Sequence, residues 1–248
     1  MSEKLANRIA LVTGAARRVG AEIAKRLHDE GASIAVHYRG SANEAAQLAA
    51  DLNVLRPDSA ATFQADLVET DALPRLVSDV IDWAGGLDIL VNNASSFYAT
   101  PVGSITEESW DDLVGTNLKA PLFLSQAAAD ALRENNGVIV NLVDVHSRRP
   151  LRDHPVYGSA KAGLAMLTRS LARDLAPDVR VNGISPGAIL WPEEGMSDAI
   201  KETILNQVPL GRPGNPKDIA ACVLFLVADA PYVTGQVIAV DGGRSLGW

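Results

Sequence analysis

Short, wholly apolar runs alternate along the chain with longer segments in which apolar and polar residues repeat at helical spacing. The apolar runs predict buried strands at residues 9–13, 33–38, 61–64, 87–91, 138–143, 179–184 and 237–240. The amphipathic segments predict helices at residues 22–30, 43–55, 70–83, 109–135, 155–175, 197–205 and 217–228. Strands that are apolar throughout are typical of a parallel sheet covered by helices on both faces.

This alternation predicts an α/β fold class: a single doubly wound, Rossmann-type parallel sheet of about seven strands with helices on both faces. No linker, internal repeat or low-complexity segment interrupts the 248 residues, so we expect one domain over residues 1–248. Pro121 lies inside the helix expected at 109–135 and predicts a kink there. Ligands of such sheets bind beyond the carboxyl ends of the strands, so the residues that follow each strand are the candidates for a site.

Composition and charge argue against several classes of protein. The net charge of −8 argues against a surface for nucleic acid, and the single cysteine, Cys222, excludes an intrachain disulfide. No apolar run reaches the roughly 18 residues of a membrane span, and no signal peptide precedes the first strand. The four histidines lack the spacing of metal ligands, so we expect no metal site. We therefore expect a cytoplasmic protein with no nucleic-acid and no membrane partner.

The segment T-G-A-A-R-R-V-G at residues 13–20 joins the first strand to the first helix. Small residues let the backbone approach a pyrophosphate, and the start of a helix supplies N–H groups and a positive potential. A plain strand-to-helix turn is the alternative. The position between a strand and a helix favours nucleotide binding.

Tyr157 and Lys161 lie four residues apart in the helix expected at 155–175, so the phenol and the ammonium share one helix face. A nearby ammonium favours phenolate and lowers the tyrosine pKa from its usual value of about 10. A tyrosine placed in this way can exchange a proton with a bound substrate. Taken alone, the pair is better explained by a chance spacing on a helix, so its function depends on the rest of the chain.

Together these motifs resemble the short-chain dehydrogenase/reductase superfamily, whose turn reads T-G-x-x-x-G-x-G, over nearly the whole chain from residue 9 to residue 245. Arg18 replaces the middle glycine, as in the pteridine reductase branch, and the resemblance implies that it reaches the cofactor pyrophosphate and the substrate pocket. Asn117, in T-N-L, matches the catalytic asparagine, which implies that it holds a water between Lys161 and solvent. Tyr157 would be the proton donor, and Lys161 would hold the cofactor ribose. The resemblance also implies a homotetramer.

The end of the second strand indicates NADPH rather than NADH. His37, Tyr38, Arg39 and Ser41 supply basic and hydroxyl groups that suit a 2′-phosphate, and no acid is present to bind a ribose 2′-hydroxyl. A solvated polar loop is the alternative, and Gly40 departs from the pteridine reductase pattern, in which a basic residue is expected. The resemblance implies that NADPH or NADP+ contacts Thr13, Gly14, Arg18, Val19, His37, Tyr38, Arg39, Ser41, Asp66, Leu67, Asn93, Ala94, Ser95, Tyr157, Lys161, Pro186 and Gly187.

Asp144 takes the place of the superfamily's catalytic serine, 13 residues before Tyr157 and three after Asn141. A serine hydroxyl donates to a carbonyl oxygen, whereas an ionised carboxylate only accepts. A ring that presents N–H groups, such as a pterin, therefore suits this site better than a simple ketone. The pteridine reductase branch carries aspartate here. The alternatives are an inactive relative that has lost its serine and a shifted catalytic serine at Ser147.

Phe97 follows the fourth strand and resembles the pteridine reductase phenylalanine that holds a flat substrate against the nicotinamide. Its alternative is a core aromatic beneath a loop. Trp191 lies in a substrate loop expected at about 188–210, where it caps the substrate or packs the loop. The substrate-binding residues implied are Arg18, Ser95, Phe97, Asp144, Tyr157 and Trp191, and the catalytic residues are Asn117, Asp144, Tyr157 and Lys161.

The resemblance implies an NADPH-dependent oxidoreductase that reduces a C=N bond of a pterin. Dihydropterin would become tetrahydropterin, and dihydrofolate or an oxidised pterin are further substrates to consider. One alternative is a carbonyl or 3-oxoacyl reductase that acts on a ketone and tolerates Asp144. A second is an NADP(H)-binding sensor without chemistry, against which the intact Asn117, Tyr157 and Lys161 argue.

Overall fold

A seven-stranded parallel sheet forms the centre of the molecule, of which the computed structural model describes residues 3–189 and 197–247. The strands lie in the order β3-β2-β1-β4-β5-β6-β7, and every neighbouring pair is parallel. Their bounds are β1 Ile9–Val12, β2 Ser33–Tyr38, β3 Ala60–Gln64, β4 Ile89–Asn92, β5 Val138–Leu142, β6 Arg180–Pro186 and β7 Val237–Val240. The predicted doubly wound α/β fold is confirmed.

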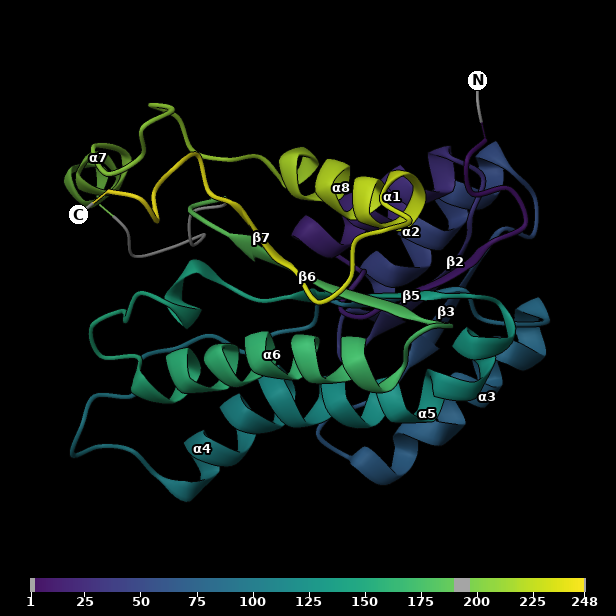
Figure 1. Cartoon of the computed structure of the whole chain (residues 1–248), viewed down its shortest axis with the longest axis horizontal. Helices are drawn as coiled ribbons and strands as arrows, with labels where there is room; N and C mark the ends of the chain where they lie inside the picture. The colour runs from purple at the N-terminus through teal and green to yellow at the C-terminus, as the bar shows by residue number, and fades with distance from the viewer. Residues whose placement is uncertain (1–2, 190–196, 248) are drawn as a thin grey trace.

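Helices cover both faces of this sheet (Figure 1). One layer contains α1 (Arg18–Asp29), α2 (Ala42–Leu55) and α8 (Pro216–Leu224), and α1 packs along α8. The opposite layer contains α3 (Leu73–Ala84), α4 (Glu107–Val114), α5 (Ala120–Glu134) and α6 (Pro155–Asp174). The remaining helix, α7 (Asp198–Leu205), lies apart from both layers beside the carboxyl edge of the sheet.

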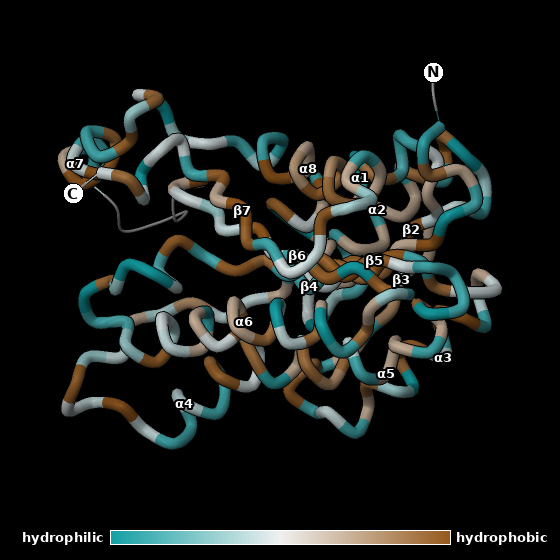
Figure 2. Tube along the Cα trace, viewed as in Figure 1, coloured by the Kyte–Doolittle hydropathy of each residue, from teal (hydrophilic) through white to brown (hydrophobic). Residues whose placement is uncertain are grey.

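The pleat of the strands divides the apolar core into two parts. Val12 of β1 packs with the α1, α2 and α8 layer, whereas the adjacent Leu11 packs with α3 and α5. Both side chains are fully buried because successive residues of a strand point to opposite faces, and both faces are covered. Figure 2 shows hydrophobic residues concentrated along the strands and hydrophilic residues at many of the outer turns. None of the helices in the described part of the chain is long and apolar enough to cross a membrane.

The order of the strands reverses at β1, because β2 pairs with one side of it and β4 with the other. Ligands of doubly wound sheets bind at such a point, beyond the carboxyl ends of the strands. The loops that follow β4 and β5 lie on the same side of the molecule as α7 (Figure 1). The chemistry-bearing segments identified in the sequence therefore gather at one edge of the sheet.

The helix expected at 109–135 consists of three parts in the structure. A π-helical segment, Gly115–Lys119, separates α4 from α5, and Pro121 directly follows this segment, in the first turn of α5. Because the three parts follow one another directly, the N–H that Pro121 lacks would have bonded the carbonyl four residues earlier, at Asn117. Short π segments inside helices occur frequently at functional sites. The helix expected at 217–228 is divided in the same way, into α8 and a π segment over Phe225–Asp229.

Candidate active site

The turn between β1 and α1 lies against the start of the β4–α4 loop. The hydroxyl oxygen of Thr13 accepts hydrogen bonds from the backbone N–H groups of Asn93 at 2.9 Å and Ala94 at 3.0 Å. Gly14 adopts a φ of +60°, and a Cβ added to Gly20 would come within 2.3 Å of the Gly14 carbonyl oxygen. Larger residues are therefore excluded at positions 14 and 20, where the backbone packs closely.

Arg18 begins α1 with a φ of +55°, in the left-handed region that favours glycine. Its side chain is exposed at the carboxyl edge of the sheet. The neighbouring Arg17 forms an exposed ion pair with Glu44, at 3.6 Å between nitrogen and oxygen. Arg18 thus accepts an unfavourable backbone conformation while its guanidinium stays on the surface near the glycine-rich turn.

His37 is buried, with only 2% of its surface exposed, and its ring supports the glycine-rich turn. The Gly14 N–H donates to Nδ1 at 3.1 Å, so Nε2 carries the proton and donates to the Ala65 carbonyl at 3.2 Å. Burial lowers the His37 pKa to about 4, although the Ala65 carbonyl and the Asp66 carboxylate oppose this effect. The expectation of a basic group facing a 2′-phosphate is corrected for this residue, because His37 is neutral and both of its ring nitrogens contact the backbone.

The remaining residues at the ends of β2 and β3 differ in how far their side chains are exposed. Arg39 is exposed, and Ser41 immediately precedes α2. Asp66 is exposed and accepts a bond from the Val68 N–H at 3.1 Å, whereas Leu67 is buried in the core against α3. The side chains of Arg39, Ser41 and Asp66 therefore remain accessible to a ligand, and that of Leu67 does not.

Tyr157 and Asp144 form a hydrogen-bonded pair beyond the end of β5. The phenol donates to Oδ2 of Asp144 at 2.9 Å, and the other carboxylate oxygen accepts from the His146 N–H at 2.8 Å. That second bond is the cap of a short 3₁₀ helix, Val145–Ser147, which begins directly after Asp144. The backbone therefore fixes the carboxylate, and the carboxylate orients the phenol.

The pKa of Tyr157 lies far above its usual range. Burial has the largest effect, followed by the charge of Asp144 and the hydrogen bond to it, while the nearby Ser95 hydroxyl acts in the opposite direction. The sequence predicts two opposing effects on this pKa, a lowering by the Lys161 ammonium and a raising by the Asp144 carboxylate, and burial together with Asp144 prevails. Tyr157 is consequently a protonated phenol at neutral pH, which is the form required of a proton donor.

Lys161 is buried in α6, and its Nζ donates to the Leu142 carbonyl at 2.8 Å. The same nitrogen lies 5.8 Å from the centre of the Tyr157 ring, so the two side chains share a helix face as expected. Burial lowers the Lys161 pKa to about 8, and the nearby Asp144 carboxylate limits the decrease. Lys161 therefore carries a charge at neutral pH, beside a carboxylate and a phenol.

Asn117 lies in the π segment with none of its surface exposed, and both the nitrogen and the oxygen of its side-chain amide form hydrogen bonds. The amide nitrogen donates to the carbonyls of Ser96 and Leu113, each at 2.9 Å, and the amide oxygen accepts from the Ser95 hydroxyl at 2.6 Å. The amide therefore holds the β4–α4 loop against α4. A water held by this side chain, as expected from the sequence, could use only the remaining acceptor capacity of the amide oxygen.

Phe97 packs against two other rings beside Tyr157. Its ring is stacked on His154, at 4.8 Å between ring centres and an interplanar angle of 18°, and meets Tyr157 edge-on, also at 4.8 Å. Even so, 53% of the surface of Phe97 is exposed. The alternative of a core aromatic beneath a loop is therefore excluded.

Comparison with known proteins identifies the family to which the chain is similar. A family model described as enoyl-(acyl carrier protein) reductase matches residues 14–245. Pteridine reductase 1 of Leishmania tarentolae is 42% identical, with 96% of each chain covered. The 3-oxoacyl-[acyl-carrier-protein] reductase FabG of Staphylococcus aureus is 39% identical over 94% of this chain and 96% of its own.

The chain belongs to the short-chain dehydrogenase/reductase family. A crystal structure assigned as a short-chain alcohol dehydrogenase, from Sinorhizobium meliloti, agrees with a TM-score of 0.94 at 34% identity, with each chain fully covered. The two named relatives are nearly equal in identity, so similarity alone does not separate pterin reduction from ketone reduction. What is established is an oxidoreductase of this family.

The other residues expected to contact ligands differ in where they lie. Pro186 ends β6, and a Cβ on the following Gly187 would come within 2.7 Å of Asp241, so a small residue is required there. Tyr38 and Val19 are partly buried, and both pack against the core beneath α1 and α2. Trp191 lies outside the described residues, as does the part of the substrate loop at 190–196.

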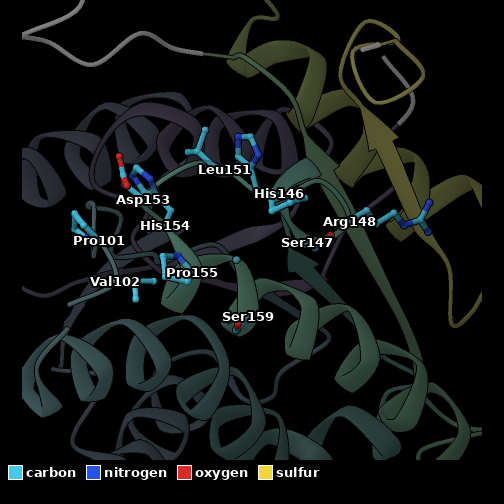
Figure 3. A pocket seen from close by; sticks show the side chains of 12 residues that line it. Pro101, Val102, His146, Ser147, Arg148, Leu151, Asp153, His154, Pro155 and Ser159 are labelled. Carbon is cyan, nitrogen blue, oxygen red and sulfur yellow. The ribbon is translucent and has the colours of Figure 1, made fainter. Parts of the chain in front are cut away.

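A cavity of about 620 Å³ lies near the Tyr157–Asp144 pair, between the β4–α4 loop and the β5–α6 loop (Figure 3). It is bordered by Pro101 and Val102 from one loop and by His146 and His154 from the other. Neither Asp144 nor Tyr157 nor Lys161 lines it. The perturbed pKa and the matched hydrogen bonds that proton transfer requires belong instead to the Tyr157–Asp144 pair.

Sequence reasoning missed His154, having considered it only as a metal ligand. Its ring contacts a side chain 57 positions earlier, and hydrophobic periodicity carries no information about such a contact. Among the described residues no group of three His, Cys, Asp or Glu side chains could hold a metal ion.

Proposed function

We propose that this short-chain dehydrogenase/reductase uses NADPH to reduce a C=N bond of a pterin, converting a dihydropterin to the tetrahydropterin. Dihydrofolate and oxidised pterins belong to the same substrate class. The single observation that carries the proposal is the 2.9 Å hydrogen bond from Tyr157 to the carboxylate of Asp144. It supports a site that accepts N–H groups from its substrate and keeps its tyrosine protonated.

Reduction of a C=N bond adds a hydride to carbon and a proton to nitrogen. NADPH, when bound, supplies the hydride. Tyr157 provides the proton, directly or through a water, and the raised pKa of its phenol favours the protonated form before transfer. Asp144 uses its remaining lone pairs to accept bonds from the N–H edge of the pterin, which orients the ring. Phe97 offers an exposed aromatic surface to that ring.

Proton supply to Tyr157 would come from the side of Lys161. We place the relay water at the backbone carbonyl of Asn117, because the side-chain amide is already bonded to Ser95, Ser96 and Leu113. In an α-helix that carbonyl would accept from the residue four positions later, which is Pro121 and has no N–H. The π segment and Pro121 together leave the carbonyl without its α-helical partner.

The glycine-rich turn suits the pyrophosphate of NADPH, since side chains larger than hydrogen are excluded at Gly14 and Gly20. Arg18, exposed at the start of α1, would add positive charge to the same site. Arg39 and Ser41 are the residues that we assign to the 2′-phosphate, with His37 now excluded from direct contact. Lys161 would hold the nicotinamide ribose.

Ketone reduction is the second candidate function, and it is favoured by the 39% identity to the 3-oxoacyl-[acyl-carrier-protein] reductase of Staphylococcus aureus. The residue at position 144 counts against it. An ionised carboxylate repels the carbonyl oxygen that a serine would bind.

Oxidation of NADPH would be followed with dihydrobiopterin, dihydromonapterin, dihydrofolate and a panel of ketones that includes a 3-oxoacyl thioester. We expect turnover with a dihydropterin and little or none with the ketones. Turnover of ketones alone would replace the proposal with its alternative.

We also propose a homotetramer for the assembled enzyme. Large apolar side chains are exposed on the outer layer formed by α4, α5 and α6: Trp110, Leu122, Phe123 and Met166. Exposed apolar patches of this kind are typical of interfaces between subunits. Light scattering coupled to size-exclusion chromatography should give four times the chain mass, and a monomeric mass would contradict the assignment.

A further inference from the structure

His154, Phe97 and Tyr157 form a continuous row of three rings at the edge of the active site. His154 is stacked on one face of Phe97, and Tyr157 meets Phe97 edge-on, both at 4.8 Å between ring centres. A flat side chain has two faces, and here one of them is covered by the imidazole. Phe97 can therefore offer only its other face to a flat substrate.

The imidazole of His154 is itself held by the backbone. Its Nδ1 lies 2.7 Å from the Arg152 carbonyl, and because a carbonyl only accepts, Nδ1 carries a proton in this bond. His154 directly precedes α6, whose first residue, Pro155, fixes the direction in which the chain enters the helix. The ring is therefore a fixed support rather than a side chain free to follow its neighbour.

A second contact joins the same two loops without using the imidazole. The Thr100 N–H donates to the Asp153 carbonyl at 2.6 Å, and Thr100 is buried. Asp153 adopts a φ of +61° as the chain turns toward His154. Since this bond lies in the backbone, the two loops should stay together when the imidazole is removed.

Open space lies on the far side of His154. The cavity of about 620 Å³ is lined by His154, Asp153, Pro101 and Val102, and Figure 3 shows these four side chains around the same opening. Among the residues that the structure describes, this open space leaves no packed side chain behind His154 to replace the imidazole as a support for Phe97. Removal of the imidazole would enlarge the opening and free Phe97 to turn into it.

We propose that His154 is a positioning residue that holds the Phe97 ring at the angle needed to stack on a flat substrate. This inference rests on the proposed function, in which Phe97 contacts a pterin. His154 acts through Phe97 and has no part in proton transfer. It should therefore affect substrate binding and leave the chemical step unchanged.

The test compares three substitutions of His154 by steady-state kinetics with a dihydropterin. His154→Ala removes the ring, His154→Leu retains apolar bulk without a flat face, and His154→Phe retains a flat ring. We expect KM to rise about 2- to 10-fold in the alanine and leucine variants, the equivalent of the ~0.5–1.5 kcal/mol of one aromatic pair, with kcat unchanged. The phenylalanine variant should restore a near-wild-type KM. NADPH binding, measured by fluorescence titration, should be the same in all three.

Three outcomes would overturn the inference. An unchanged KM in His154→Ala would show that Phe97 needs no support. A lower KM would show that the imidazole occupies the face that the substrate requires, and a fall in kcat without a change in KM would place His154 in the chemistry. Phe97→Ala, measured in parallel, separates this inference from the proposed function. If it raises KM while His154→Ala does not, only the inference is wrong, whereas a wild-type enzyme that turns over no pterin refutes both.

Discussion

Replacing Asp144 by serine converts the site to the arrangement typical of the family and should abolish most pterin reduction. In the wild type, one carboxylate oxygen accepts the Tyr157 phenol at 2.9 Å and the other accepts the His146 N–H at 2.8 Å. A serine can still cap the short helix, because its hydroxyl also accepts from a backbone N–H two residues on. It is shorter and uncharged, so it cannot also serve Tyr157 and the substrate.

The size of the effect follows from the hydrogen bonds that the carboxylate would no longer accept, one from Tyr157 and the others from the pterin. A hydrogen bond to a charged group contributes about 1.5–3 kcal/mol, and each 1.36 kcal/mol corresponds to a tenfold change in rate. Loss of the bond from Tyr157 alone therefore predicts a decrease of roughly 10-fold or more in kcat/KM. Loss of the bonds to the pterin N–H groups as well predicts a decrease of about 10²-fold or more.

The assay is kcat/KM for a dihydropterin and for a small ketone, with NADPH binding and thermal unfolding measured on the same preparations. Asp144→Asn is the matched control for charge, since it retains volume and one acceptor oxygen, and we expect it also to lose pterin reduction. Ser147→Ala controls for the alternative of a shifted serine, and it should leave kcat/KM within about twofold, as expected for a residue outside the chemistry. A serine variant that reduces pterins as well as the wild type would remove the main reason for preferring pterins over ketones.

Three further predictions follow. Tyr157→Phe should retain NADPH binding while kcat falls about 10²–10⁴-fold, and a rate near that of the wild type would remove Tyr157 from the proton transfer. Arg39→Asp should lower the preference for NADPH over NADH by about 5-fold or more, because a carboxylate near a 2′-phosphate costs about 1 kcal/mol even in water, and an unchanged ratio of the two kcat/KM values would contradict our assignment. The His37 pKa is about 4 in the folded chain and about 6.5 in an unfolded one. Between these two pH values unfolded chains bind more protons, so the free energy of unfolding decreases as pH falls through this window. The loss is about 3 kcal/mol in all, and denaturant titrations of His37→Asn, which cannot titrate, should show a correspondingly flatter dependence on pH.

The sequence predicted the fold from local rules, and the resemblance to short-chain dehydrogenases/reductases indicated that Asp144 takes the place of the catalytic serine. Continuous apolar runs and helical repeats indicate a parallel sheet, and the residues after each strand lie at one edge of it. The place of Asp144 follows from its distance along the chain to Tyr157. The structure adds the 2.9 Å hydrogen bond between them, and it shows that burial contributes most to the raised tyrosine pKa.

The features that the sequence did not predict depend on how deeply a side chain is buried and on small local changes in a helix or a loop. His37 was expected to face a phosphate, but it is buried within β2. Its ring nitrogens bond the Gly14 N–H and the Ala65 carbonyl instead. In the π segment at Gly115–Lys119, backbone hydrogen bonds join residues five positions apart instead of four. A change of this size over one turn is too small to be detected in the apolar repeat of the sequence. The stacking of His154 on Phe97 joins two loops, where no periodic pattern exists.

The hydroxyl of Thr13 has a consequence for the order in which the two ligands bind. It accepts both the Asn93 and the Ala94 N–H groups, so the turn that would hold the pyrophosphate is bonded directly to the segment that leads into Phe97. A cofactor that rigidifies this turn would thereby also rigidify the aromatic support of the substrate, and the substrate would then lose less entropy on binding. We therefore expect compulsory-order kinetics, with the dinucleotide first on and last off. In product-inhibition experiments NADP+ should compete with NADPH and should not compete with the pterin.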